Sequence, residues 1–393
     1  MSLISLGEIN KNILYPIIGG LSKLIAEFIL FIREPQFTKY PFILGAVAGF
    51  GMFLSIIPFI ILKIKLRKEN TEKQAKNKLL IYNNPNDVFH RKIFCIKYLL
   101  IFCASLLDFS QKSLTFLFPE DIINNFWVFD ILFITFFSRI VIKSKLYSYQ
   151  LFSLGMIIIL GIIFNIVNLI GSGDFKFSSF ILVMSIEIIF SLEIVIEKYT
   201  MEYKFCSPYQ ICIFEGLFEI IANIILLKFS HNIGMDDDDF FNYIKDLKKE
   251  EVSIKEEIIL LMVSMISRLF FKLFSLITIN LYTSSHVVII LFLGEIMLIF
   301  TNGHKEEDKL YIFKIVCNIL LLVLLFLMFL VFTEFIELNF CGLQKFTKKN
   351  IAKRALTEVY LDNEKNKNED FRDSCMDPIN DEEENEIPSQ KEK

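Results

Sequence analysis

Charged side chains interrupt several of the most apolar stretches of the chain. The segment 185–199, SIEIIFSLEIVIEKY, places Glu187 and Glu193 among Ile, Leu, Val and Phe residues. A charge at the centre of a bilayer costs ~2.5–3.5 kcal/mol on insertion scales, so such groups usually face the interior of a helix bundle or a water-filled cavity. Carboxyl groups kept there can exchange protons or contact cations, which is the chemistry of ion and solute pathways.

Two further apolar segments carry charged pairs at helical spacing. In PYQICIFEGLFEIIANIILL, Glu215 and Glu219 are four positions apart, and in MVSMISRLFFKLFSL, Arg268 and Lys272 have the same spacing. Residues four apart lie on one face of a helix, so both members of each pair point in one direction. Glu295 lies near the middle of another apolar run, VVIILFLGEIMLIF.

Acids outnumber bases at membrane depth in this half of the chain, with five carboxyl groups against two basic side chains. Ion pairs can neutralise at most two of the acids, so the others must be protonated, hydrated or matched by a bound cation. Each of these states fits a pathway for protons or cations. The alternative is structural: Glu193 and Glu215 snorkel to nearby interfaces. The two bases then clamp Glu219 and Glu295 for assembly.

The first half carries fewer charges at depth. Asp108 (LLDFSQKS) and Asp130 (FWVFDILF) both lie toward the outer side of their apolar segments, and the only tryptophan, Trp127, is close to Asp130. We expect the two acids to be polar groups of an outer cavity. The predicted substrate-binding residues are Asp108, Trp127, Asp130, Glu187, Glu219, Arg268, Lys272 and Glu295.

Long helices that cross a membrane must position these charges. Of the 393 residues, 54% are hydrophobic and 15% aromatic, and the mean hydropathy is +0.51. Apolar stretches of ~20 residues are typical of transmembrane helices. The sequence therefore predicts an all-α membrane protein. Its ten predicted spans are 12–32, 41–63, 93–116, 124–143, 149–170, 178–198, 208–229, 257–282, 285–301 and 311–336.

Basic residues predict the orientation of these spans. The loop 64–92 carries eight Lys and Arg residues, whereas the next loop, FPEDIINN, carries none. This asymmetry favours cytoplasmic positions for both termini. The polar segment 341–393 lacks hydrophobic periodicity and is predicted to be a disordered cytoplasmic tail. The run DDDD at 236–239 is interpreted as a solvated loop.

Sequence signatures of catalysis and metal binding are not found. The chain contains no GxSxG, HExxH or Walker pattern, and its seven cysteines are scattered without a CxxC pair. His286 beside Ser284 and Ser285 is the only suggestive cluster, and a polar cap at a helix turn is the favoured interpretation. We therefore expect no enzyme activity, no metal site and no cofactor. The basic runs flank predicted spans, so no nucleic-acid partner is expected.

Two segments resemble a known family of membrane proteins. FCASLLDFSQKSLTFLF is similar to the "P-A-L-C-D…T-S-L" third span of the F group of solute carrier family thirty-five, with Asp108 at the Asp position. IEKYTMEYKFCSPYQICIFEGLF resembles the "L-E-E-K-F…H-P…T-E-G-L-F" stretch of that group. The matching residues there are Glu197, Lys198, Pro208, Glu215, Gly216, Leu217 and Phe218. The group belongs to the drug/metabolite transporter superfamily, which includes nucleotide-sugar transporters.

The resemblance implies ten helices in two inverted five-helix repeats, with the substrate held between them. The predicted units are one repeat over 1–170, a second over 171–340 and the tail over 341–393. A nucleotide sugar is anionic and favours Arg or Lys as partners. The segments that correspond to the cavity lining of the family have lost basic residues here, and surplus acid is present.

We therefore predict a multi-pass transporter that moves a small solute by alternating access, with proton or cation coupling left open. The alternatives are a non-transporting scaffold or receptor that retains the fold, and a nucleotide-sugar transporter with altered motifs. The expected partners are the lipid bilayer and the small-molecule solute, and a homodimer is left open. Analogy with the family favours an endomembrane such as Golgi, lysosome or vacuole.

Overall fold

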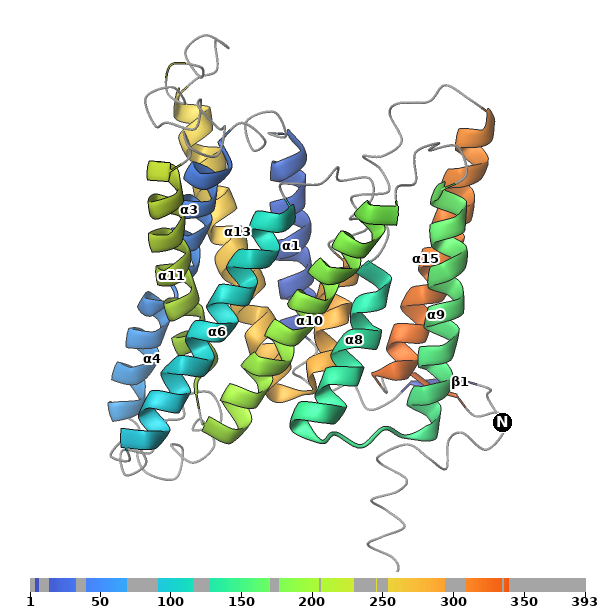
Figure 1. Ribbon diagram of the computed structural model, residues 1–393, viewed down its shortest axis with the longest axis horizontal. Helices are drawn as coiled ribbons and strands as arrows, with labels where there is room; N and C mark the ends of the chain where they lie inside the picture. Colours follow the sequence, from blue (N-terminus) through green and yellow to red (C-terminus); the bar gives the residue numbers. More distant parts are fainter. Residues whose placement is uncertain are drawn as a thin grey trace, which may run out of the picture.

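The part of the chain that the computed structural model describes is built almost wholly from helices (Figure 1). The structure describes residues 4–6, 14–32, 40–68, 91–115, 127–169, 177–204, 206–229, 245, 254–293, 309–333 and 336–338. The α-helices are α1 (Leu14–Ile32), α3 (Pro41–Phe53), α4 (Ile56–Lys68), α6 (Arg91–Thr115), α8 (Asp130–Phe137), α9 (Ser148–Leu169), α10 (Phe177–Lys204), α11 (Pro208–Phe229), α13 (Ile254–Leu281) and α15 (Lys309–Phe332).

Short elements complete the described chain. The 3₁₀ turn η3 (Trp127–Phe129) precedes α8, and the π-helix η4 (Ser138–Ile142) extends it. A second 3₁₀ turn, η6 (Ser284–His286), opens an apolar helix that the structure describes as far as Leu293. The strands β1 (Ile4–Leu6) and β2 (Ile336–Leu338) pair antiparallel.

The predicted helical class is confirmed for the described residues. Among them, five stretches are long and apolar enough to cross a membrane: Pro41–Ile64, Ser148–Val167, Pro208–Lys228, Lys255–Leu281 and Ile315–Phe332. The first of these stretches combines α3 with α4. The arrangement of ten spans in two repeats stays a prediction. The tail 341–393 and the run 236–239 lie outside the described residues.

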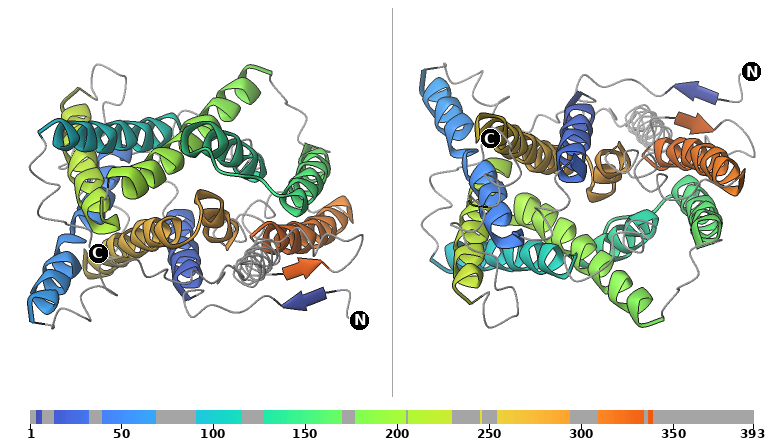
Figure 2. Two further views of the ribbon diagram at one scale, coloured as in Figure 1. Left: turned by 90° about the horizontal axis from the view of Figure 1, so that it is seen from below. Right: turned by 90° about the horizontal axis from the view of Figure 1, so that it is seen from above.

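Helices α10 and α13 lie near the centre of the bundle. α10 packs against α6, α8 and α13, and α11 packs against α3, α6 and α13. α1 also packs against α13, and α9 pairs with α15 at one end of the molecule (Figure 2). The helices α6, α10, α13 and α11 therefore form a ring in which each contacts its two neighbours.

The outer faces of several helices are apolar. In α15, Phe313, Val316, Leu320 and Val323 are each more than half exposed and follow one another at intervals of three or four residues. α1 and α9 carry similar exposed rows of Ile, Leu and Phe. Such extensive apolar faces are unusual on soluble proteins and are expected where helices meet lipid. The described helices are therefore compatible with a multi-pass membrane protein.

Local sequence signals set the start of α11. Pro208 is its first residue, where the missing N–H and the fixed φ of proline favour a helix. The backbone N–H of Gln210 donates to Ser207 Oγ (3.2 Å), and that of Ser207 donates to Gln210 Oε1 (3.3 Å). This reciprocal arrangement is a capping box. Lys97 Nζ of α6 also donates to Gln210 Oε1 (3.1 Å), so the cap ties the two helices together.

A proline separates α3 from α4. Pro58 has no backbone N–H, so it cannot donate to the carbonyl of Leu54, four residues earlier, and its ring crowds that carbonyl. The chain turns at Leu54 and Ser55, and the N–H of Ile57 donates to Leu54 O (3.0 Å) in a tighter turn. The two helices are therefore straight segments of one bent span.

Glycines allow α3 and α11 to approach closely. A Cβ atom at Gly216 would lie 2.4 Å from the backbone nitrogen of Phe53 and 2.6 Å from the carbonyl oxygen of Gly49. A Cβ at Gly49 would lie 3.0 Å from Glu219 Cβ and from Gly216 O. Small residues at a crossing are typical of helix pairs in membranes. This contact fixes the turn of α11 that carries Glu215 and Glu219.

Replacing Gly216 by Ala should destabilise the protein by about 1–3 kcal/mol, as is typical of overpacking. The added Cβ would meet backbone atoms, which cannot rotate away. Thermal unfolding of the purified protein in detergent measures the loss. Gly155→Ala in α9 is the matched control, because a Cβ there meets nothing within 4 Å. Equal losses in the two variants would contradict the close approach of α3 and α11.

Candidate functional site

Four neighbouring helices each carry two charged side chains one turn apart. The pairs are Asp108 and Lys112 on α6, Glu193 and Glu197 on α10, Glu215 and Glu219 on α11, and Arg268 and Lys272 on α13. Both members of each pair lie on the same face of their helix. The ring of α6, α10, α13 and α11 brings these faces together. We call the eight residues the charged network.

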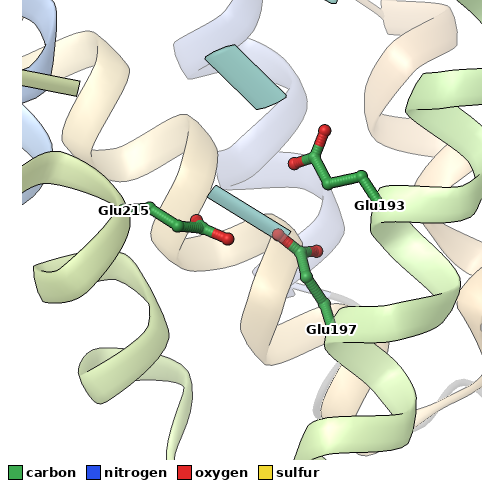
Figure 3. A group of neighbouring side chains, drawn as sticks. All are labelled: Glu193, Glu197 and Glu215. Atoms are coloured by element: carbon green, nitrogen blue, oxygen red, sulfur yellow. The ribbon is translucent and has the colours of Figure 1, made fainter. Parts of the chain in front are cut away.

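Lys272 contacts three carboxylates at once. Its Nζ lies 2.6 Å from Glu193 Oε1 and 2.7 Å from Glu197 Oε1, both on α10. Glu215 Oε2 on α11 is 3.1 Å away. Figure 3 shows the three glutamates converging from the two helices, and one oxygen of each lies within 4.8 Å of the others. We call Glu193, Glu197 and Glu215 the triad, a group whose oxygens are placed to hold a cation.

Lys112 organises the other end of the charged network. Its Nζ lies 2.8 Å from Asp108 Oδ2 on its own helix and 3.0 Å from Glu219 Oε1 on α11. Both carboxylates are buried, whereas 29% of the Lys112 side chain is exposed. Arg268 is close enough to Asp108 and Glu219 for Coulomb attraction. The network therefore runs from a partly exposed end at Lys112 to a buried end at the triad.

Negative charge is in excess within the charged network, which has five carboxyl groups against three basic side chains. Glu193 Oε2, Glu215 Oε1 and Glu219 Oε2 are buried and accept no hydrogen bond from any residue that the structure describes. A buried carboxylate that lacks compensation is strongly unfavourable. Protons or a bound cation can supply the missing positive charge.

Several predicted substrate-binding residues lie in this network, namely Asp108, Glu219, Arg268 and Lys272. The structure thus brings together residues from both halves of the chain. Trp127 is the first residue of η3, and its side chain lies outside the described part of the structure. Glu295 also lies outside the described residues.

Glu187 and Asp130 are buried but form a separate region. Glu187 precedes Glu193 by six residues on α10, which is about 9 Å along the helix axis. One turn after Glu187, Ser191 donates a hydrogen bond to the backbone carbonyl of Asp130 at the start of α8 (3.3 Å). Glu187 therefore lies on the side of α10 that faces the start of α8.

The structural alternative is wrong for the snorkelling of Glu193 and Glu215. Its clamp of Glu219 by Arg268 agrees with the Coulomb attraction between these two residues, and its clamp of Glu295 lies outside the described residues. Glu193 and Glu215 are each 1% exposed, so they do not snorkel to an interface. Lys272 contacts these two acids and Glu197. The ion-pair partner of Glu219 is Lys112. The depth of a residue along its helix does not predict these ion pairs, because depth carries no information on which neighbouring helix the side chain faces.

The predicted set of site residues omits Lys112 and the triad. Lys112 follows Asp108 by four residues in DFSQK, and an acid and a base at this spacing can form a helical ion pair. That signal is the same one that identifies the pairs on α11 and α13. The triad is harder to predict, because its three members meet only through the packing of α10, α11 and α13.

Lys198 closes the C-terminal end of α13. Its Nζ donates to the carbonyl oxygens of Asn280 (3.4 Å) and Tyr282 (2.9 Å) and lies 2.8 Å from Glu202 Oε1. The last carbonyl groups of a helix carry partial negative charge and favour a nearby cation. Lys198 lies in the stretch that resembles the solute carrier family, and here it holds α10 against the C-terminal end of α13.

Two groups with potential reactivity are structural. His286 and Thr283 form a capping box at the start of η6, with Thr283 Oγ1 2.8 Å from the histidine Nδ1. The predicted polar cap is therefore confirmed. Cys206 lies between α10 and α11, where burial raises the pKa of its thiol to about 12. That thiol stays protonated near neutral pH, which makes it a poor nucleophile.

The chain matches no model of a known protein family and no curated protein sequence. Its resemblance to the drug/metabolite transporter superfamily stays a prediction. Function is therefore inferred from the charged network and from the helices that are compatible with a membrane.

Replacing Lys272 by Met should destabilise the protein by about 3–5 kcal/mol, because it leaves three buried carboxylates without their shared cation. Thermal unfolding in detergent provides the measurement. Lys112→Met should cause a smaller loss, since Lys112 is partly exposed and contacts two carboxylates. The exposed Lys145 gives the control variant Lys145→Met. Equal stability of the Lys272 and Lys145 variants would show that the triad does not depend on Lys272.

Proposed function

We propose that the protein is a multi-pass membrane transporter that moves a small solute by alternating access between two inverted five-helix halves, 1–170 and 171–340. The observation that best supports this proposal is the charged network, which buries five carboxyl groups among four helices. Ionisable groups are expensive inside a membrane and mark ion or substrate pathways. We place the protein in an endomembrane, with both termini in the cytoplasm.

Contacts between the proposed halves support a mechanism in which one half moves against the other. α1, α3, α6 and α8 belong to the first half and pack against α13, α11 and α10 of the second. Lys112 of the first half contacts Glu219 of the second. A change in this ion pair would alter a contact across the boundary, and rocking of two halves about a shared site is the common transporter mechanism.

The sign of the charge favours a cationic or proton-coupled solute. Lys112 contacts two carboxylates and Lys272 contacts three, so neither lysine is available to an anion without losing these contacts. The third basic group, Arg268, is attracted to Asp108 and Glu219. An anionic nucleotide sugar would need such groups. The excess of carboxyl groups instead favours the uptake of positive charge.

A scaffold or receptor is the second candidate. Each of the five carboxyl groups in the charged network lies within 3.1 Å of a lysine nitrogen. Such pairing also suits a static set of helices that are held together by ion pairs. The two candidates differ in one measurable property, which is the movement of solute across a sealed membrane.

Uptake into proteoliposomes tests the proposal. Cationic solutes should accumulate when a proton gradient is imposed, and neutral or anionic solutes should not. Glu215→Gln should lower this uptake by roughly tenfold, within the range typical of coupling free energies. The matched control is Glu256→Gln, because Glu256 is exposed in the first turn of α13.

Two results would contradict different parts of the proposal, the first the transport activity and the second the role of the charged network. One is a folded, reconstituted protein that moves no member of the panel under either direction of the proton gradient. The other is equal uptake by the Glu215→Gln and Glu256→Gln variants, which would show that Glu215 of the charged network takes no part in transport. The first result would favour the scaffold.

A further inference from the structure

The triad has the geometry of a binding site for a primary ammonium group. An ammonium group carries three N–H donors. Lys272 Nζ lies 2.6, 2.7 and 3.1 Å from one oxygen of each of three carboxylates, and it donates a hydrogen bond to one of them, Glu193 Oε1. The head group of any primary alkylammonium ion offers the same charge and the same donors. We propose that the solute is a primary ammonium ion whose head group replaces Lys272 in the triad, an inference that rests on the proposed transport function.

Unused acceptor atoms in the triad support a ligand beyond Lys272. Glu193 Oε2, Glu197 Oε1 and both carboxylate oxygens of Glu215 are buried and accept no hydrogen bond from the described residues. The exposed fraction of the side chain is 1% at Glu193 and 0% at Glu215. Buried acceptors at a point of excess negative charge are costly, and an added cation with N–H donors satisfies both requirements.

Two carboxyl groups outside the triad can accept the ammonium group of Lys272 when the solute displaces it. Glu219 lies one turn after Glu215 on α11, and its Oε2 accepts no hydrogen bond from the described residues. Asp108 is close enough to Lys272 for Coulomb attraction. Lysine has a long flexible stem, and neighbouring turns of a helix are about 5–6 Å apart. Lys272 can therefore pass from the triad to Asp108 and Glu219 while it stays paired.

Exposure indicates the route by which a solute reaches the triad. The exposed fraction of the side chain falls from 29% at Lys112 to 12% at Lys272 and 0% at Glu215. These three residues belong to adjoining helices of the ring. A cation that enters at Lys112 would first meet Asp108 and Glu219, which contact Lys112, and then the three carboxylates around Lys272.

Thermal unfolding with a model solute tests the proposal in purified full-length protein. n-Butylammonium reproduces the side chain of lysine, whereas tetramethylammonium has the same charge and no N–H donor. n-Butylammonium should raise the unfolding temperature of Lys272→Met with saturation. Tetramethylammonium at equal ionic strength should have no such effect. In the unsubstituted protein, half-saturation should require at least about tenfold more n-butylammonium, because the tethered Lys272 competes at a high effective concentration.

Controls separate the triad from general salt effects. Lys145→Met removes an exposed lysine and should respond as the unsubstituted protein does. If Lys272→Met does not fold, Glu193→Gln combined with Lys272→Met lowers the surplus negative charge and retains two triad carboxylates. That double variant should still distinguish n-butylammonium from tetramethylammonium. Equal effects of the two ions on every foldable variant would overturn the proposal, as would an equal effect of potassium chloride, which would identify a site for inorganic cations.

A negative result in the binding test and a negative result in the uptake test contradict different proposals. Saturable n-butylammonium binding to Lys272→Met, without uptake by the unsubstituted protein, would retain the ammonium site and overturn the transporter. Uptake of another solute class, with no n-butylammonium binding to any Lys272 variant, would retain the transporter and overturn the ammonium site.

Discussion

One lysine ammonium shared by three buried carboxylates is the interaction on which the interior depends. Lys272 connects α13 to α10 and α11, so a single side chain fixes the relative positions of three helices. A buried ion pair gains stability only when its geometry satisfies its donors and acceptors. The capping box at Ser207 and the close crossing of α3 and α11 at Gly216 position α11 for the contact with Lys272. Apolar outer faces keep the charges away from lipid.

The charged network is incompletely compensated, and this separates it from a simple structural clamp. A static clamp would be most stable with equal numbers of acids and bases. The network instead retains acceptor atoms that no described residue satisfies. Its stability must then respond to any added positive charge, because a ligand that binds the folded state shifts the balance toward it. A site of this kind is sensitive to its occupant, and the Lys112 to Glu219 contact carries that sensitivity across the two proposed halves.

The sequence predicts the helices well, because long apolar runs leave few alternatives to a helix in lipid. Pro208 predicts the start of α11, and Pro58 indicates a break between α3 and α4. Spacing of four residues also predicts which acids share a face. This spacing does not predict which neighbouring helix the charged face contacts, so the triad is absent from the predicted site residues. Lys112 is also absent from them, although it has the same spacing to Asp108. Pairing depends on rotation and packing of whole helices, which Gly49 and Gly216 help to set through backbone contacts that no local pattern encodes.

The small ribbon of β1 and β2 has a consequence for the topology. Ile4 is opposite Leu338, so the chain before α1 and the chain after α15 lie at the same place. A chain that leaves and returns to one side of a bilayer crosses it an even number of times. Among the described residues, five stretches are long and apolar enough to cross a membrane, which is an odd number. If all five cross, the paired ends require at least one further crossing elsewhere in the chain, and α6 and α10, with 25 and 28 residues, are long enough to provide it.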